Sequence, residues 1–217
     1  MNLLQYERLL TLTKEYVRQE LQNDASGHDW WHIARVTDMA KKIATEEKAD
    51  LFICEMSALL HDIADEKLNS SEAEGLEKVR TWLISIEVDP LSADKIIEII
   101  STLSFKGGGQ PEMKTLEGKI VQDADRLDAI GAIGIARTFA YAGAKGELIY
   151  DPAIKPRESF TKEEYRNGKS TAINHFYEKL LKLKNGMNTN SAKKMAEERH
   201  QYMEEYLRVF FDEWKSL

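Results

Sequence analysis

The chain has 217 residues, of which 42% are hydrophobic and 31% charged, and its formal net charge is −7 at pH 7. This composition is that of an ordinary globular protein, and the length favours a single domain over residues 1–217. The acidic balance argues against non-specific binding to nucleic acid or to anionic membranes. A bound cation can still create a local site for an anionic substrate.

Helical periodicity dominates the N-terminal part of the chain. Two segments carry apolar residues at spacings that place them on one face of a helix. A cluster of turn-forming residues, N-D-A-S-G, separates the two segments. The predicted apolar faces comprise Tyr6, Leu10, Val17 and Leu21 in the first segment, and His32, Val36, Met39 and Ile43 in the second.

The next two predicted helices begin with recognisable caps. Asp50 precedes the run from Leu51 to Leu60, which is apolar almost all round and therefore predicts a central, buried helix. Asp89 and Pro90 form an N-cap followed by proline at the first helical position, which is typical of a helix start.

The C-terminal part also has helical period. We expect one helical region from Leu116 to Tyr141, with Gly131 and Gly134 at close approaches between helices, and a last helix from about Ser191 to Trp214. A long irregular loop over residues 143–159 follows the first of these regions, and such loops are often functional. Because no pair of alternating strands with a hairpin turn is found, the sequence predicts an all-α helical bundle.

Apolar residues of the last helix include Tyr206, Val209, Phe210 and Trp214. They suit either the core of the chain or an interface with a second copy, so a homodimer is one expectation. The only cysteine, Cys54, lies in an apolar run and is predicted to be a buried thiol. The N-terminus does not resemble a signal peptide, and no stretch is long and uncharged enough for a membrane span. We expect a cytoplasmic protein without a membrane partner.

The run L-L-H-D-I-A-D-E ends a core helix with an imidazole and a carboxylate, His61 and Asp62. Burying such groups without a counter-charge is costly, and a metal ion is one way to supply it. His32, on the apolar face of its helix, is a candidate partner, although it also suits a core histidine. Asp125 is another, in Q-D-A-D-R-L-D, where Asp123 and Asp128 are alternatives and any of the three acids could be solvated.

Four sequence segments together resemble the HD-domain superfamily of metal-dependent phosphohydrolases. They are G-H-D-W-W-H-I-A-R-V, L-L-H-D-I-A-D-E-K, S-F-K-G-G and V-Q-D-A-D-R-L-D-A-I-G. They are similar to a small bacterial branch that includes manganese-dependent nucleoside triphosphate pyrophosphohydrolases. The resemblance implies an all-helical HD-type fold and a metal site formed by His32, His61, Asp62 and Asp125.

This implied set of two imidazoles and two carboxylates, without a thiolate, suits Mn²⁺, Mg²⁺ or Fe²⁺ better than a closed zinc site. Mn²⁺ is favoured by the resemblance. Such an ion can acidify a water and neutralise charge on phosphorus, so hydrolysis of a phosphoester or phosphoanhydride follows from the ligand set.

Further site residues surround the implied metal. Asp65 follows Asp62 by three residues, and in the superfamily an acid at this place often acts as general acid/base; a surface acid is the alternative. Lys106 precedes three glycines, in a segment that opens with Ser104, and could bind phosphate or mark a flexible turn. Arg35 and His28 are candidate substrate-binding residues near His32.

The ligand set predicts a metal-dependent phosphohydrolase. The resemblance further implies that it converts a (deoxy)nucleoside triphosphate to the monophosphate and pyrophosphate, using a metal-activated water, so the choice of cleaved bond comes from the resemblance and not from the residues. A nucleotide phosphomonoesterase or phosphodiesterase would use the same residues. A nucleotide-binding or structural metal module without turnover is the alternative from another class of proteins.

Overall fold

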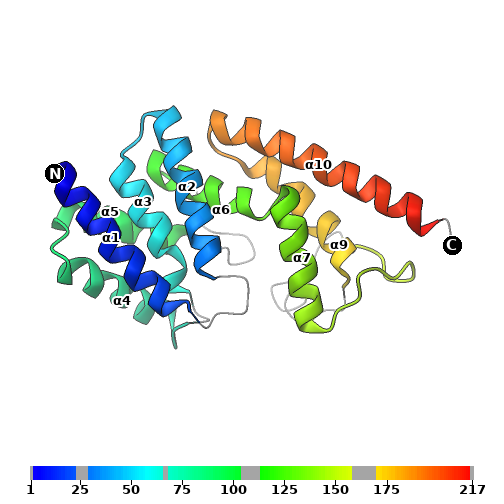
Figure 1. Cartoon of the computed structure of the whole chain (residues 1–217), viewed down its shortest axis with the longest axis horizontal. Coiled ribbons are helices and arrows are strands. Elements are labelled where there is room, and N and C mark those ends of the chain that lie inside the picture. The colour runs from blue at the N-terminus through cyan, green and yellow to red at the C-terminus, as the bar shows by residue number, and fades with distance from the viewer. Residues whose placement is uncertain (1, 23–28, 66–67, 104–112, 158–169, 216–217) are drawn as a thin grey trace. The chain divides into compact units, whose positions relative to one another are not determined.

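The computed structural model describes residues 2–22, 29–65, 68–103, 113–157 and 170–215 (Figure 1). In these ranges the regular backbone is helical, without a β-strand, and an isolated bridge joins Leu148 to Thr171. The all-α prediction is confirmed. The helices are α1 (Leu3–Glu20), α2 (Trp30–Glu47), α3 (Leu51–Leu60), η1 (His61–Ala64), α4 (Glu72–Ser85), α5 (Pro90–Leu103), α6 (Leu116–Asp128), α7 (Gly131–Lys145), α9 (Ala172–Glu178), η2 (Leu180–Gly186) and α10 (Asn190–Trp214); η1 and η2 are 3₁₀ helices.

The chain divides into two compact units, Met1–Ala124 and Asp125–Leu217, with the boundary inside α6. A single domain over residues 1–217 stays a prediction. None of the helices in the described ranges combines the length and the apolar character that crossing a bilayer requires.

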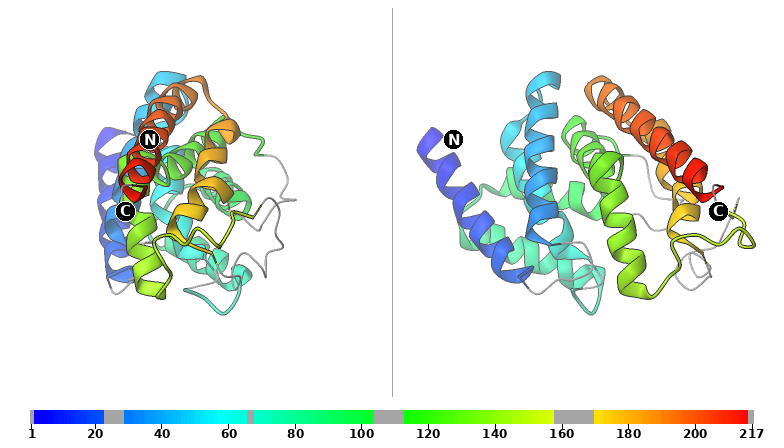
Figure 2. Two further views of the ribbon diagram at one scale, coloured as in Figure 1. Left: turned by 90° about the vertical axis from the view of Figure 1, so that its right-hand side faces the viewer. Right: turned by 45° about the vertical axis from the view of Figure 1, so that its right-hand side comes forward.

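Helix α3 forms the centre of the first unit, as its all-round apolar sequence predicts. Asp50 caps it by accepting hydrogen bonds from the amides of Phe52 and Ile53 at 3.0 and 3.2 Å. Every residue from Phe52 to Leu60 is buried, and α1, α2 and α5 pack around the helix (Figure 2). Cys54 is among them, in agreement with the predicted buried thiol.

A buried carboxylate, Glu55, connects the three N-terminal helices. Tyr6 of α1 donates its hydroxyl to one carboxylate oxygen, and Lys41 Nζ of α2 lies 3.3 Å from the other. Burial and the bond to Glu55 raise the pKa of the Tyr6 phenol above its ordinary value. This connection ties α2 to α3, the two helices that bring His32 and His61 into the site.

The helical region expected from Leu116 to Tyr141 is interrupted. Helix α6 ends at Asp128, and α7 begins at Gly131, whose φ of +75° only glycine adopts readily. The predicted close approach between helices is present at Gly131, which meets α10, whereas Gly134 meets the turn that precedes its own helix. A Cβ at Gly131 would lie 2.9 Å from Cγ of Arg199, and one at Gly134 would lie 2.2 Å from the carbonyl oxygen of Ala129.

The loop expected at 143–159 begins later, because α7 continues to Lys145 and is closed by Gly146 at φ +70°. The described part of this loop is anchored to α9. Glu178 accepts hydrogen bonds from Arg157, with its Nε at 3.0 Å, and Asn174 donates to the carbonyl of Ile154 at 2.9 Å. Residues 158 and 159 lie outside the described residues.

In the second unit, α10 packs against α7 and η2. Its aromatic residues meet partners from the same unit: Tyr206 stacks with Phe176 at 5.9 Å between ring centroids, and Tyr150 meets the edge of Trp214 at 5.1 Å. The apolar residues near the C-terminus therefore contribute to packing within the chain. A homodimer stays a prediction.

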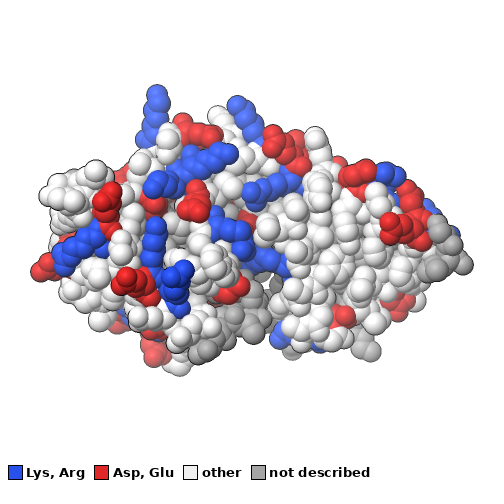
Figure 3. Space-filling view, viewed as in Figure 1, with Lys and Arg blue, Asp and Glu red and all other residues white. Residues whose placement is uncertain are grey.

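Charged side chains are unevenly distributed on the face in Figure 3. Over the first unit Lys and Arg alternate with Asp and Glu, whereas α7 and the adjoining side of α10 carry few charges. Large apolar residues exposed on these two helices are Ile133, Tyr141, Tyr202, Val209 and Trp214.

Candidate metal centre

The His-Asp pair lies where α3 changes into a tighter turn. Helix α3 ends at Leu60, and His61 to Ala64 form η1. The amide of Asp65 donates to the carbonyl of Asp62 at 3.0 Å, which is the short-range bond of a 3₁₀ turn. Asp62 is 6% exposed, so its carboxylate leaves the helix end into the interior of the first unit.

His32 comes to the same place from the first turn of α2. The carboxylate of Asp29 accepts a hydrogen bond from the amide of His32 at 2.9 Å and so begins the helix. The side chain of His32 lies on the buried face with Val36 and is 1% exposed. Because α2 packs along α3, this face points toward the end of α3.

The three side chains converge on one point. His32 Nε2 lies 3.6 Å from Asp62 Oδ2, and His61 Nε2 lies 3.3 Å from Asp62 Oδ1. The two imidazole rings meet edge to face, with centroids 5.5 Å apart. One ligand atom from each residue lies within 4.8 Å of the other two, which is the spacing of donors around a single cation.

The tautomer of His61 suits metal binding. Its Nδ1 lies 2.8 Å from the carbonyl oxygen of Ala58, which can only accept, so Nδ1 carries the proton. In the neutral ring this leaves the lone pair on Nε2, the nitrogen 3.3 Å from Asp62 Oδ1, for a cation. Metal-binding histidines commonly donate their second ring nitrogen to a backbone carbonyl in this way. The two imidazoles and the carboxylate therefore fit a divalent cation that accepts both nitrogen and oxygen ligands.

Asp65 closes η1 with a φ of −64° and a ψ of 139°. The helical value of φ directs its Cα–Cβ bond as in a continuing 3₁₀ helix, in which residues three apart eclipse each other. The Cα–Cβ bond of Asp65 therefore leaves the turn in about the direction of that of Asp62, while the extended ψ of Asp65 ends the helix. The side chain is less buried than that of Asp62.

The other predicted site residues divide into two groups. Arg35 lies one turn after His32 on α2 and is partly buried, and Asp125 lies on α6 in the second unit and is partly buried. His28, Ser104 and Lys106 lie outside the described residues. The metal-binding and substrate-binding roles of these residues stay predictions.

The two acids that flank Asp125, Asp123 and Asp128, are both buried. Asp128 is buried, and its Oδ2 accepts from Arg137 at 2.6 Å. Asp123 is fully buried. Arg126 donates a hydrogen bond to the carbonyl of Gly186.

Sequence reasoning missed Asn69. Its Nδ2 donates to the carbonyls of Ile63 and Asp65, at 2.8 and 2.9 Å, on the backbone that carries the predicted ligands. An asparagine followed by two serines is a turn signal, and this was the signal available in the sequence.

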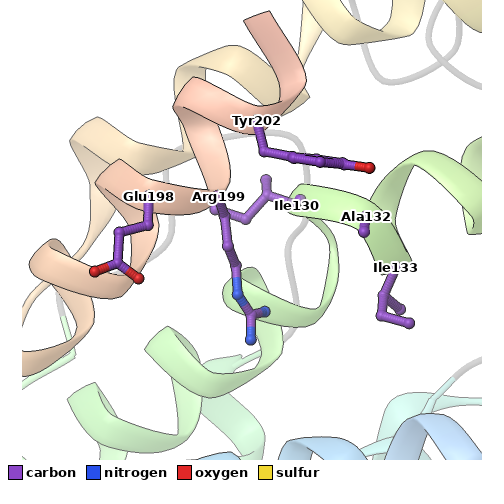
Figure 4. A pocket seen from close by; sticks show the side chains of 7 residues that line it. Ile130, Ala132, Ile133, Glu198, Arg199 and Tyr202 are labelled. Carbon is purple, nitrogen blue, oxygen red and sulfur yellow. The ribbon is translucent and has the colours of Figure 1, made fainter. Parts of the chain in front are cut away.

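A pocket of about 310 Å³ lies within the second unit, between the start of α7 and the middle of α10 (Figure 4). Its walls are mostly apolar and include Ile130, Ile133 and Tyr202. The guanidinium of Arg199 at its edge donates to the carbonyl of Leu127. The side chains of the metal cluster do not line this pocket.

Comparison with known proteins places this geometry in context. Residues 30–130 match the family model of the HD domain. The chain is 43% identical to YpgQ of Bacillus subtilis over 197 residues, which are 90% of this chain and 88% of YpgQ. The crystal structure of YpgQ in complex with ADP superposes with a TM-score of 0.79 at 38% identity and covers 96% of each chain. A crystal structure from Bacillus thuringiensis, described as an HD-superfamily hydrolase, has a TM-score of 0.80 at 48% identity and covers 98% of this chain and all of its own.

Proposed function

This chain belongs to the HD-domain superfamily of metal-dependent phosphohydrolases, and we propose that it hydrolyses a (deoxy)nucleoside triphosphate to the monophosphate and pyrophosphate. The observation that carries the proposal is the buried cluster of His32, His61 and Asp62, whose ligand atoms lie within 4.8 Å of one another. The ADP complex of YpgQ supports a nucleotide as the ligand.

The protein residues would hold the cation in a defined way. His61 offers Nε2, because Nδ1 is committed to the carbonyl of Ala58, and Asp62 supplies carboxylate oxygens between the two imidazoles. Asp125 is the proposed fourth ligand. A divalent cation bound there, for which we favour Mn²⁺ over Mg²⁺ or Fe²⁺, would acidify an attacking water and neutralise negative charge on the phosphates.

The remaining chemistry belongs to the side chains. The carboxylate of Asp65, three residues after Asp62, would take the proton from the attacking water and return one to the leaving group. Arg35 would contribute positive charge for the phosphates, as would Lys106, with Ser104 and His28 as further substrate-binding residues.

The activity is tested by incubating the purified chain with each nucleoside tri-, di- and monophosphate and Mn²⁺, and separating the products by chromatography. We expect pyrophosphate and monophosphate in equal amounts. Release of orthophosphate and a nucleoside would instead indicate a phosphomonoesterase. Absence of turnover with every nucleotide would refute the proposal.

A nucleotide-binding module without turnover is the alternative, because such a module would also bind ADP as YpgQ does. The two proposals differ in what they require of Asp65. A binding module gains nothing from an acid beside the metal ligands, whereas a hydrolase depends on it. Loss of hydrolysis with intact nucleotide affinity in Asp65→Asn would exclude the binding module.

A further inference from the structure

Helix α4 approaches η1 more closely than a side chain would allow. Gly75 is buried where α4 meets η1, and a Cβ at this position would lie 2.6 Å from the carbonyl oxygen and 2.8 Å from the Cα of Ala64. Both are backbone atoms, so neither can rotate away. Glycine in a helix interior costs about 1 kcal/mol relative to alanine, and the close approach to Ala64 explains its presence at this position.

The side chain of Asn69 acts on the same backbone segment. Its Nδ2 donates to the carbonyls of Ile63 and Asp65, the residues on either side of Ala64. The amide of Leu68 donates to the carbonyl of Asp65 as well, at 3.0 Å. A Cβ at Gly75 would also lie 2.8 Å from this Nδ2. Gly75 and Asn69 thus confine the three residues that directly follow Asp62.

This confinement affects the position of both acids. Ala64 is covalently linked to Asp65 and lies two residues after Asp62, so a displacement of its backbone moves both carboxylates. Metal–ligand distances tolerate deviations of only about 0.2 Å. We propose that Gly75 and Asn69 are positioning residues that hold Asp62 for the cation and Asp65 for proton transfer, a role that rests on the proposed function.

The first test is Gly75→Ala, with the Mn²⁺ affinity of the cluster measured by titration calorimetry and kcat measured on a nucleoside triphosphate. We expect Mn²⁺ to bind about 10- to 100-fold more weakly, which is the usual effect of disturbing the support of a metal ligand. The matched control is Gly143→Ala, on the exposed side of α7, where a Cβ would meet no atom within 4 Å. This control should keep the affinity of the wild-type protein.

A second variant is available if Gly75→Ala fails to fold. Asn69→Asp preserves the size of the side chain but replaces the amide donor with a carboxylate that faces two carbonyl oxygens. It should weaken Mn²⁺ binding and lower kcat to a similar extent. Asn69→Asp adds no atom to the contact between η1 and α4. If both variants lose Mn²⁺ affinity and kcat, the displaced backbone of η1 is therefore the common cause.

General destabilisation is tested with Leu83→Ala, a fully buried residue two turns further along α4. This variant should lower the thermal midpoint while retaining Mn²⁺ affinity. If Gly75→Ala and Asn69→Asp weaken Mn²⁺ binding no more than Leu83→Ala does, the inference is overturned. A wild-type chain that binds Mn²⁺ without hydrolysing nucleotides, with weakened binding in both variants, would support the inference and reject the proposed function. Nucleotide hydrolysis with unchanged affinity and kcat in both variants would reject the inference alone.

Discussion

The imidazole of His61 owes its tautomer to the end of a helix. The last four carbonyls of an α-helix have no partner within it. Ala58 is in the last turn of α3, so its carbonyl is available to the ring of His61 at 2.8 Å. The backbone therefore selects Nε2 as the nitrogen that faces Asp62, before any ligand is bound.

Asp65→Asn tests the assignment of proton transfer to a single carboxylate. The amide has the same shape but cannot act as a base, so we expect kcat to fall by about 10²- to 10⁴-fold. Mn²⁺ affinity should stay unchanged, because Asp65 is not one of the proposed ligands. Steady-state kinetics with calorimetry checks both values. The exposed acid Asp38 on α2 provides the control, since Asp38→Asn should behave as the wild-type protein.

We expect His175 in α9 to make the folded chain less stable at acid pH. Burial, followed by the charge of Lys179, lowers the pKa of His175 from 6.5 to about 4. Between these values the unfolded chain binds a proton that the folded chain does not, so stability decreases as the pH falls from 6.5 toward 4. Because of this residue, the free energy of unfolding measured with denaturant should be about 1–2 kcal/mol lower at pH 5 than at pH 7. A His175→Asn variant with an undiminished difference would contradict this prediction.

At the scale of elements, the turn between α6 and α7 depends on the backbone of Gly131. Its φ of +75° is a backbone conformation that residues with a side chain rarely adopt. A Cβ added at this position would also lie 2.9 Å from Cγ of Arg199, which is too close. Gly131→Ala should destabilise the protein by about 1–2 kcal/mol. Chemical denaturation measures this. Gly143→Ala, in the same helix but facing open space, should instead be neutral or stabilising by up to about 1 kcal/mol.

The segment before residue 158 depends on the ion pair between Glu178 and Arg157, at 2.6 Å. Burial raises the pKa of Glu178, but the hydrogen bonds and charge of Arg157 outweigh it, so the carboxyl stays ionised. Glu178→Gln removes the buried carboxylate charge from this ion pair and should cost about 3 kcal/mol. Urea unfolding at pH 7 is the measurement. An equal loss in the exposed control Glu213→Gln would show that the ion pair is not responsible.

For the whole molecule, metal binding should appear as thermal stability. A cation that binds only the folded chain stabilises it by about 2.7 kcal/mol at 100 times its Kd. For a chain of this length we expect Mn²⁺ to raise Tm by about 5–10 °C, and chelation to reverse the increase. Thermal unfolding with and without Mn²⁺ checks this. His61→Ala should abolish the response, and an undiminished response in that variant would place the cation elsewhere.

Sequence alone determined the helical class and the starts of α3 and α5, because these depend on local periodicity and on the caps Asp50 and Asp89. It also identified His32 as an unusual polar residue on an apolar face. The break at Gly131 was harder to predict, since its neighbours continue the helical pattern and only the φ angle shows the interruption.

Only the tertiary structure brought His32 to His61 and Asp62, because the packing of α2 on α3 joins segments about thirty residues apart. The same holds for Gly75 and Asn69. A glycine in a helix and an asparagine in a turn are common, and neither residue type indicates which backbone it will contact. Local preferences are encoded within a few neighbouring residues, whereas contact between distant segments depends on how complete helices pack.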